Sequence, residues 1–264
     1  MTIHATSPHF VVDALRGDRT IRPLADTTSA AGLRAMLEDG LYGVFAENPP
    51  RASLYLRASS LTPAYVGGNV ERSSMAQVRG VLVHHLLRLA SVGATIADAL
   101  EDSLDAWRSE VDTNDLLDRV AQLNPDEHAR LRADVAAHYN TLSNSLGDIG
   151  AGWLARTGVR AAQRLAGGNV ELRDVVDLMV GTTTTSVASV ALLDLTTAPL
   201  GEGAERALRF HALMQTLRTS VVPLRSSIFS SATGELWTQD VDFALLARSV
   251  DDVVRAVRDR SVAA

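Results

Sequence analysis

The spacing of apolar residues predicts a short N-terminal segment ahead of the main body of the chain. An apolar run over residues 9–15 predicts a short strand. Thr28 and Ser29 are typical N-cap residues, and the spacing after them predicts a helix that stops at the prolines of residues 48–50. We interpret residues 1–55 as an extension that packs on the main domain.

Residues 73–148 carry apolar side chains at helical spacing and predict a block of helices, which a loop over residues 59–72 precedes. The predicted helix starts lie near residue 73, at Thr95, at Thr113 and at Asn124-Pro125. The last of these helices has acidic residues in its first turn and runs to about Leu146.

Beyond residue 158 the pattern changes to short apolar strands and helices separated by turns. The predicted elements are strands at residues 159–165, 170–179, 187–195 and 221–229, a return strand at 236–238 after Gly234, and helices that begin near residue 203 and near residue 242. This series predicts an α/β or α+β domain over residues 56–264. Its mixed sheet would be flanked by helices, with a large helical insert before the sheet.

The composition is that of an ordinary globular protein. Hydrophobic residues make up 46% and aromatic residues only 5%, so Leu, Val and Ala must build most of the core. Cysteine is absent, which excludes disulfide partners, thiolate zinc sites, iron–sulfur clusters and cysteine nucleophiles. The first residues lack a signal-peptide pattern, and no apolar stretch reaches about 18 residues. We therefore expect a cytoplasmic protein with no membrane anchor.

The charge of the chain restricts its chemistry further. The formal net charge of −6 weakens the expectation of tight, salt-dependent DNA binding, although it does not exclude a nuclease. All 25 basic residues are arginines. Because the chain has no lysine and arginine stays protonated at neutral pH, a Schiff base and a lysine-activated water are both excluded.

One histidine and two aspartates are candidates for a metal site. His84 lies on a predicted helix, whereas Asp177 and Asp194 end predicted strands. Carboxylate oxygens suit Mg²⁺, and an imidazole shifts the preference towards Mn²⁺. His85 points about 100° away from His84 around the helix, so only one of the two can face the site. Each candidate also has a structural interpretation, as a partly buried helix histidine or as a turn or strand-end acid.

The motifs that contain these residues occur in a recognisable order. They are Arg79-Gly80-x-x-Val83-His84, Leu172-Arg173-x-x-Val176-Asp177 and Asp194-x-x-Thr197, followed by Arg209-Phe210-His211, Val221-Val222-Pro223 and Gly234-Glu235. Together they resemble the RecB-type nuclease branch of the PD-(D/E)xK superfamily, in the form found in actinobacteria. The resemblance covers about residues 57–260 and implies a restriction-endonuclease-like fold. It also implies that His84, Asp177 and Asp194 bind Mg²⁺ or Mn²⁺, with the backbone carbonyl of Leu195 completing the site.

The chain departs from this family at several catalytic positions. Thr196 stands where the family has the lysine that positions and activates the attacking water, and a hydroxyl supplies no positive charge. The family's Gln-x-x-x-Tyr becomes Ala207 and His211, of which His211 is the candidate replacement acid or base, beside its interpretation as a satisfied helix residue. The strand at residues 159–165 lacks the glutamate of many relatives, and the cluster-binding cysteines are absent. The loss of one charge-stabilising group costs about 10²–10³ in rate, so we expect weak cleavage or none.

The candidate catalytic residues are accordingly Asp177, Asp194, Thr196 and His211. Three functions fit them. The first is a degenerate nuclease fold that binds nucleic acid or a partner, such as a helicase or repair protein, in DNA repair or recombination. The second is an active Mg²⁺- or Mn²⁺-dependent DNA nuclease in which Thr196 or His211 orients the water. The third is a nuclease fold recruited to other metal-assisted chemistry on a small molecule. The arginines from which a phosphate-facing strip could form are those at 156, 160, 164, 206, 209, 218 and 225.

Overall fold

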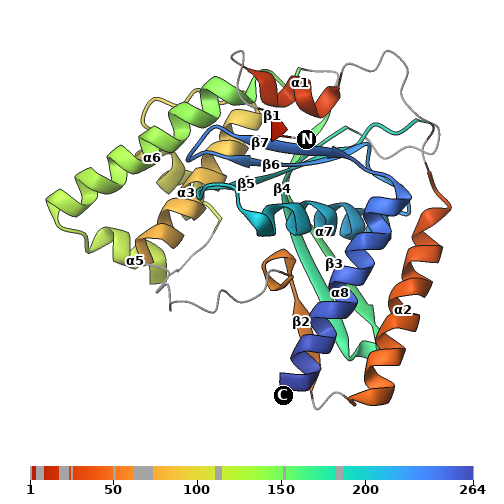
Figure 1. Ribbon diagram of the computed structural model, residues 1–264. Helices are drawn as coiled ribbons and strands as arrows, with labels where there is room; N and C mark the ends of the chain where they lie inside the picture. The colour runs from red at the N-terminus through yellow and green to blue at the C-terminus, as the bar shows by residue number, and fades with distance from the viewer. Residues whose placement is uncertain are drawn as a thin grey trace.

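The computed structural model describes residues 2–3, 9–17, 24, 26–49, 52–61, 74–110, 115–150, 153–181 and 187–263. In these ranges a seven-stranded mixed sheet runs in the order β1-β7-β6-β5-β4-β2, with β3 also paired to β4 (Figure 1). The strands are β1 (Thr2–Ile3), β2 (Leu54–Leu56), β3 (Ala155–Leu165), β4 (Val170–Val180), β5 (Ala191–Thr196), β6 (Arg225–Ser230) and β7 (Leu236–Asp240). The predicted mixed sheet flanked by helices is confirmed.

One edge of β4 pairs with two different strands and leaves an unpaired interval between them. β3 pairs with β4 antiparallel over its whole length. On the opposite edge, β2 runs parallel to residues 170–172, whereas β5 runs antiparallel to residues 178–180. Within the described ranges no strand pairs with residues 173–177 on that edge. This interval between β2 and β5, which we call the sheet gap, is where the candidate site lies.

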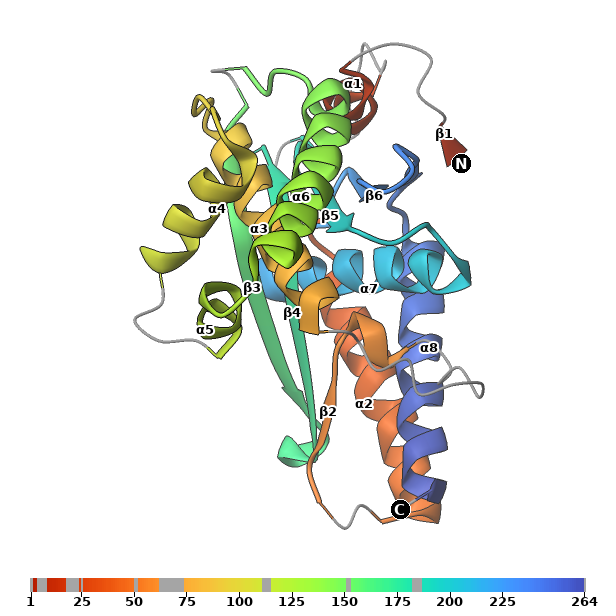
Figure 2. The ribbon, with the colours of Figure 1, turned by 90° about the vertical axis from the view of Figure 1, so that its left-hand side faces the viewer.

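Three helices cover one face of the sheet, namely α2 (Ser29–Glu47), α7 (Glu202–Thr219) and α8 (Phe243–Ala263). α2 and α8 run side by side in both views (Figures 1 and 2). Residues 208–217 of α7 are all buried, as expected for a helix enclosed on more than one side. Leu37, Phe210 and Leu246 are fully buried in the apolar cluster that these helices share with β2, β3 and β4.

The opposite face is covered by helices from the N-terminal half of the chain. They are α1 (Phe10–Arg16), α3 (Ser74–Ser91) and α6 (Pro125–Leu146). Their side chains Phe10, Val83 and Leu142 share a cluster with Leu193 of β5 and Phe229 of β6. The helices α4 (Ala99–Arg108) and α5 (Asp115–Ala121) build a further cluster with α3 and α6, away from the sheet. The predicted helical block is confirmed.

The start of α6 illustrates why this block forms where the pattern places it. The Asn124 side chain accepts a hydrogen bond from the Glu127 amide at 2.9 Å, and the Glu127 carboxylate accepts one from the Asn124 amide at 3.1 Å. This reciprocal arrangement satisfies two amides that have no partner inside the helix, and Pro125 costs nothing at the first position.

Several predicted elements differ in the structure. The predicted strand at residues 9–15 is wrong, because that segment is helix α1. Phe10, Val11 and Leu15 of α1 are buried on the side that faces the sheet, so the core decides the conformation of this short apolar run. The apolar run at 187–195 forms a strand only from Ala191 onward, and Val187 makes an isolated bridge with Leu24.

Helix boundaries shift by a few residues. The helix predicted from Thr95 begins at Ala99, with Asp98 as its cap. The Thr28 side chain does not cap α2; the Asp26 carboxylate accepts instead from the amide of Thr28, just before the helix, and from that of Ser29, its first residue. Thr113 and most of the predicted loop at 59–72 lie outside the described residues.

The described part of residues 1–55 contacts the rest of the chain extensively. Leu33, Leu37 and Leu41 of α2 belong to the same apolar cluster as α7 and α8, and β2 begins at Leu54. The boundary near residue 56 between an N-terminal extension and a main domain stays a prediction. In the part of the chain that the structure describes, no helix combines the length and apolarity that a bilayer crossing needs.

Candidate functional site

Four elements bring titratable side chains to the sheet gap. His84 comes from α3, Asp174 and Asp177 from β4, Asp194 from β5 and His211 from α7. Because neighbouring side chains of a strand alternate between its faces, Asp174 and Asp177, three residues apart, point to opposite faces of β4. Asp177 meets His84, and Asp174 meets His211. The predicted residues His84, Asp177, Asp194 and His211 are thus brought together.

Asp177 links three of these elements. Its Oδ2 lies 3.1 Å from Nε2 of His84 and accepts a hydrogen bond from the Leu195 amide at 2.7 Å. β5 has already left its backbone pairing with β4 at Leu195, so the carboxylate takes the place of a backbone acceptor. Asp177 therefore holds β5 beside β4 at the point where the two strands separate.

His84 carries a proton on both ring nitrogens. Its Nδ1 lies 2.5 Å from the Gly80 carbonyl and its Nε2 faces the Asp177 carboxylate, so both nitrogens meet acceptors. Burial opposes this charge, but Asp177 and the Gly80 carbonyl outweigh it and raise the pKa of His84 to about 9. The pair is an imidazolium–carboxylate ion pair at neutral pH.

His211 lies between two carboxylates. Its Nδ1 is 2.9 Å from Oδ1 of Asp174, and its Nε2 is 3.4 Å from Oδ2 of Asp194, which is long for a hydrogen bond. The His211 side chain is 4% exposed. Burial alone would lower its pKa, but the charges of Asp174 and Asp194 raise the pKa well above 6.5. Asp174 was absent from the sequence prediction, and it is the residue that orients this ring.

The two predicted carboxylate ligands are neighbours with opposite shifts. Burial, together with the charge of Asp177, raises the pKa of Asp194 to about 6 despite the nearby His211. Burial also opposes ionisation of Asp177, but the His84 charge and hydrogen bond lower its pKa below the ordinary value. Asp177 is therefore fully ionised at neutral pH, whereas the pKa of Asp194 lies closer to neutral pH than that of Asp177.

The residue types at this site suit a divalent cation, but their arrangement does not. One imidazole and two carboxylates suit Mn²⁺ or Mg²⁺. However, His84 is paired with Asp177, and Asp194 contacts His211. Across the described ranges no three His, Asp or Glu side chains are grouped as they would be around an ion. In this arrangement the residues do not fit a divalent cation, which would first have to displace a histidine from each carboxylate.

Thr196 and Ala207 occupy the positions where the resemblance implies the lysine and the glutamine. The Thr196 hydroxyl accepts a hydrogen bond from the Ala198 amide at 3.1 Å, and its carbonyl accepts from the Ser231 amide at 2.9 Å. Thr196 thus holds the turn after β5 and brings no charge. Both residues line the pocket described next.

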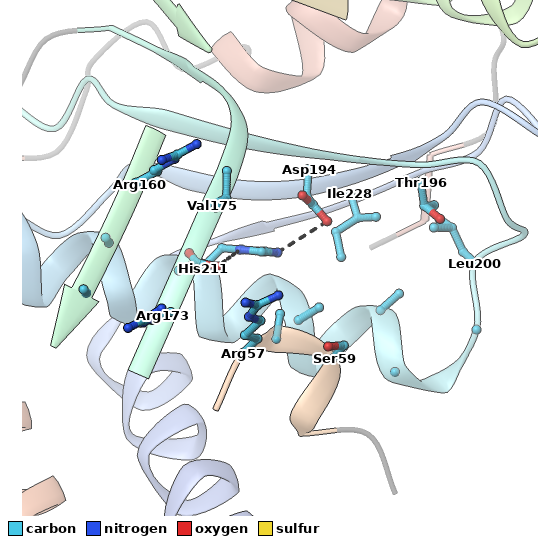
Figure 3. A pocket seen from close by; sticks show the side chains of 18 of the residues that line it. Arg57, Ser59, Arg160, Arg173, Val175, Asp194, Thr196, Leu200, His211 and Ile228 are labelled. Atoms are coloured by element: carbon cyan, nitrogen blue, oxygen red, sulfur yellow. Dashed lines mark hydrogen bonds and ion pairs between the residues drawn. The ribbon is translucent and has the colours of Figure 1, made fainter. Parts of the chain in front are cut away.

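A pocket of about 950 Å³ opens beside the Asp194–His211 pair. In Figure 3, Arg160 and Arg173 lie at one end of it and Thr196 and Leu200 at the other, with Asp194 and His211 between them. Arg57 lines it from below, next to Ser59, as Figure 3 shows. The lining of the pocket therefore includes two carboxylates, those of Asp174 and Asp194, and the guanidinium groups of three arginines.

Strand register explains why these arginines gather. Arg160 lies opposite Val175, and Arg164 lies opposite Glu171, on the face of the β3–β4 hairpin that points away from α2 and α8. Arg173 shares this face because it is two residues from Glu171. We call Arg57, Arg160, Arg164 and Arg173 the arginine face.

The arginine face has little negative charge to balance it. Glu171 accepts a hydrogen bond from Arg173 at 2.5 Å and lies 3.8 Å from Arg164. Among the described residues no carboxylate pairs with Arg57 or Arg160. The sequence had suggested Arg160 and Arg164 for such a strip, but not Arg57 or Arg173, whose positions depend on strand pairing.

Other arginines proposed for the strip lie elsewhere. Arg209 is buried and pairs with Glu205 and Asp252. Arg225 pairs with Asp240 at the far side of the sheet. These two stabilise the fold and do not face the pocket.

Comparisons with known proteins add little to this geometry. No model of a known protein family matches the chain, and no curated protein matches it. Matching solved structures include one titled "Crystal structure of SSO0001", with 9% sequence identity and a TM-score of 0.30, over 84% of each chain. A likeness at this TM-score carries no argument about fold or function.

Proposed function

We propose that this protein is a degenerate nuclease-fold protein of the PD-(D/E)xK type that binds a nucleic-acid strand by its phosphates and does not cleave it efficiently. It would act in the cytoplasm beside a helicase or repair protein. One observation carries the proposal: the predicted metal-binding carboxylates are each in contact with a histidine, while unpaired arginines rim the adjoining pocket.

The arginine face supports phosphate binding. A guanidinium group donates several hydrogen bonds in a fixed plane and matches a phosphate better than an ammonium does. Because the whole chain has a net charge of −6, attraction to a polyanion needs a local cluster of positive charge such as this face. Phosphate contacts of this kind position a strand without selecting its sequence.

The weak cleavage follows from the interior of the site. Thr196 provides no positive charge beside Asp194, and the histidines neutralise the carboxylates that a cation would need. Robust Mn²⁺-dependent cleavage by the pure protein, abolished by Asp194→Ala, would contradict the proposal.

We expect the double variant Arg57→Ala/Arg160→Ala to bind a fluorescent single-stranded oligonucleotide at least about tenfold more weakly than the wild type. A hydrogen bond to a charged group contributes about 1.5–3 kcal/mol, and about 1.4 kcal/mol corresponds to a tenfold change in affinity. Neither arginine has a carboxylate partner among the described residues, so the fold loses little. Each phosphate contact on a single strand contributes about 0.7 to the slope of log affinity against log salt concentration. The loss of two such contacts should therefore make the slope flatter by roughly 1.4. Fluorescence anisotropy at four salt concentrations measures both quantities.

The matched control is Arg108→Ala on α4, an exposed arginine whose ion-pair partner among the described residues is Asp105. It should leave affinity and salt slope unchanged. If the wild type binds neither single- nor double-stranded oligonucleotides at low salt, the proposed function is wrong.

An active metal-dependent nuclease is the second candidate. It is favoured by the contacts of Asp177 with both His84 and Asp194, and by the Nδ1 contact of His84 with the Gly80 carbonyl, which is typical of a metal-ligating histidine. Titration calorimetry with Mn²⁺ at pH 7 separates the candidates. We expect no micromolar binding to the wild type. Micromolar binding that Asp194→Ala abolishes would favour the nuclease instead.

A further inference from the structure

An exposed tyrosine stands beside the arginine face. The Tyr55 side chain projects from β2, and the residue is 55% exposed, although it lies in the middle of a strand. A hollow of about 250 Å³ lies against it, lined by Tyr55, Leu56, Arg57 and Arg173. Arg57 and Arg173 also line the main pocket, so the two hollows adjoin.

Strand register places Tyr55 on this face. Leu56 is fully buried, so the alternation of β2 turns Tyr55 outward. Tyr55 lies opposite Glu171 of β4, and Arg173 is two residues further on the same face. The tyrosine is thus part of the same surface as Arg164 and Arg173.

The ring is held in place by its neighbours. The Arg173 guanidinium lies 5.1 Å from the centre of the Tyr55 ring, as in a cation–π contact. The same guanidinium donates to Glu171, which fixes its plane. On the backbone side, Arg260 of α8 donates to the Tyr55 carbonyl at 3.0 Å. An exposed aromatic ring fixed in this way loses little conformational entropy when it binds a flat partner.

We propose that Tyr55 and Arg173 form a stacking subsite for an unpaired nucleobase, next to arginines that hold the phosphate of the same nucleotide. The proposal rests on the proposed function, since those arginines are the phosphate-binding residues. Arg57 follows Tyr55 by two extended residues, about 7 Å along the strand, a distance of the order that separates a base from its own phosphate.

The chemistry of the subsite defines its ligand. Tyr55 and Arg173 offer flat surfaces to a base, and every base has such a face, so the subsite does not select among bases. A base inside a duplex is already stacked on both sides and cannot enter. The ligand is therefore a nucleotide with a free base, either within a single strand or alone.

The test compares Tyr55→Ala, Tyr55→Phe and Tyr42→Ala with the wild type in fluorescence-anisotropy titrations. Tyr42 is a matched control because it is an exposed tyrosine on α2, away from this surface. The probes are a labelled single-stranded adenine tetranucleotide and the same backbone with abasic sugars. Unlabelled AMP serves as a competitor.

We expect Tyr55→Ala to bind the adenine tetranucleotide about tenfold more weakly and the abasic backbone as the wild type does. Tyr55→Phe and Tyr42→Ala should match the wild type with both probes. Competition by AMP that Tyr55→Ala weakens would identify free nucleotides as ligands as well. Without such competition the ligand is the strand.

The other outcomes overturn the inference in distinguishable ways. If the wild type binds both probes equally, there is no base subsite, although phosphate binding stands. Equal losses for both probes in Tyr55→Ala would show that Tyr55 only supports the fold. If the wild type binds neither probe, the proposed function fails too. The comparison of the two probes on the wild type decides the matter even if Tyr55→Ala does not fold.

Discussion

Asp194→Asn is expected to stabilise the protein at pH 7, by about 2 kcal/mol. Burial and the neighbouring Asp177 raise the pKa of Asp194 from 3.8 to about 6, and its side chain is only 24% exposed. Such a rise corresponds to about 2–3 kcal/mol, at about 1.4 kcal/mol per unit. Because the folded pKa lies above the unfolded one, the contribution of Asp194 to stability is complete below pH 3.8 and is lost as the pH rises through 6.

Asparagine resembles the protonated acid and avoids this loss. The difference in the free energy of unfolding between variant and wild type should therefore be small near pH 4, grow up to pH 6 and stay constant above it. Urea unfolding at pH 4, 5, 6 and 7 measures the profile.

Asp177→Asn is the control and should act in the opposite direction. The His84 charge lowers the pKa of Asp177, so this carboxylate stabilises the fold above pH 3.8 and loses its effect as the pH falls through the lower folded pKa. Its removal at pH 7 leaves the His84 imidazolium facing a neutral amide. Destabilisation of similar size by both variants would contradict the opposite shifts that the structure assigns to this pair.

Gly181→Ala should destabilise the protein by about 3 kcal/mol, from backbone strain and overpacking together. Gly181 directly follows β4 and has a φ of +95°, and a Cβ there would lie 2.2 Å from the Ser189 carbonyl oxygen and 2.9 Å from the Trp153 indole nitrogen. The backbone cannot move aside easily. Its amide donates to the Leu154 carbonyl, and its carbonyl accepts from Arg156, both at 2.8 Å. Urea unfolding at 25 °C measures the loss.

Gly167→Ala separates the effect of backbone strain from the effect of overpacking. Gly167 has a φ of +64° in the β3–β4 turn, but a Cβ there meets nothing within 4 Å. We expect a loss of about 1 kcal/mol from the left-handed backbone alone. Equal losses at the two glycines would show that the contact with Ser189 is unimportant.

The long elements and the proximity of His84 to Asp177 were predictable from the sequence, although their direct pairing was not. α6 has a capping box and a proline at its start, and the β3–β4 hairpin has apolar runs on both sides of a glycine turn. These signals are local, so they do not depend on the rest of the fold. The motif order named His84, Asp177 and Asp194 together, and Asp177 contacts the other two, whereas their role as a metal site stays a prediction.

Other features depend on contacts between distant segments and could not be predicted. Residues 9–15 carry too few positions to separate strand from helix, and burial against the sheet decides in favour of helix α1. Strand β2 has three residues and no turn signal of its own. Arg57, Arg173 and Asp174 acquire their partners only through the pairing of β2 with β4 and the packing of α7, which no single stretch of sequence encodes.

The pairing of β2 with β4 also sets an order of assembly. Leu56 pairs with Leu172, 116 residues later, and the whole helical block lies between them. Closing so long a loop has a high entropic cost, whereas the helices of that block form their shared core from near neighbours. We therefore expect the helical block to fold first and β2 to join the sheet afterwards. On this expectation, a chain still emerging from the ribosome would form its helices before the proposed binding surface, which needs β4.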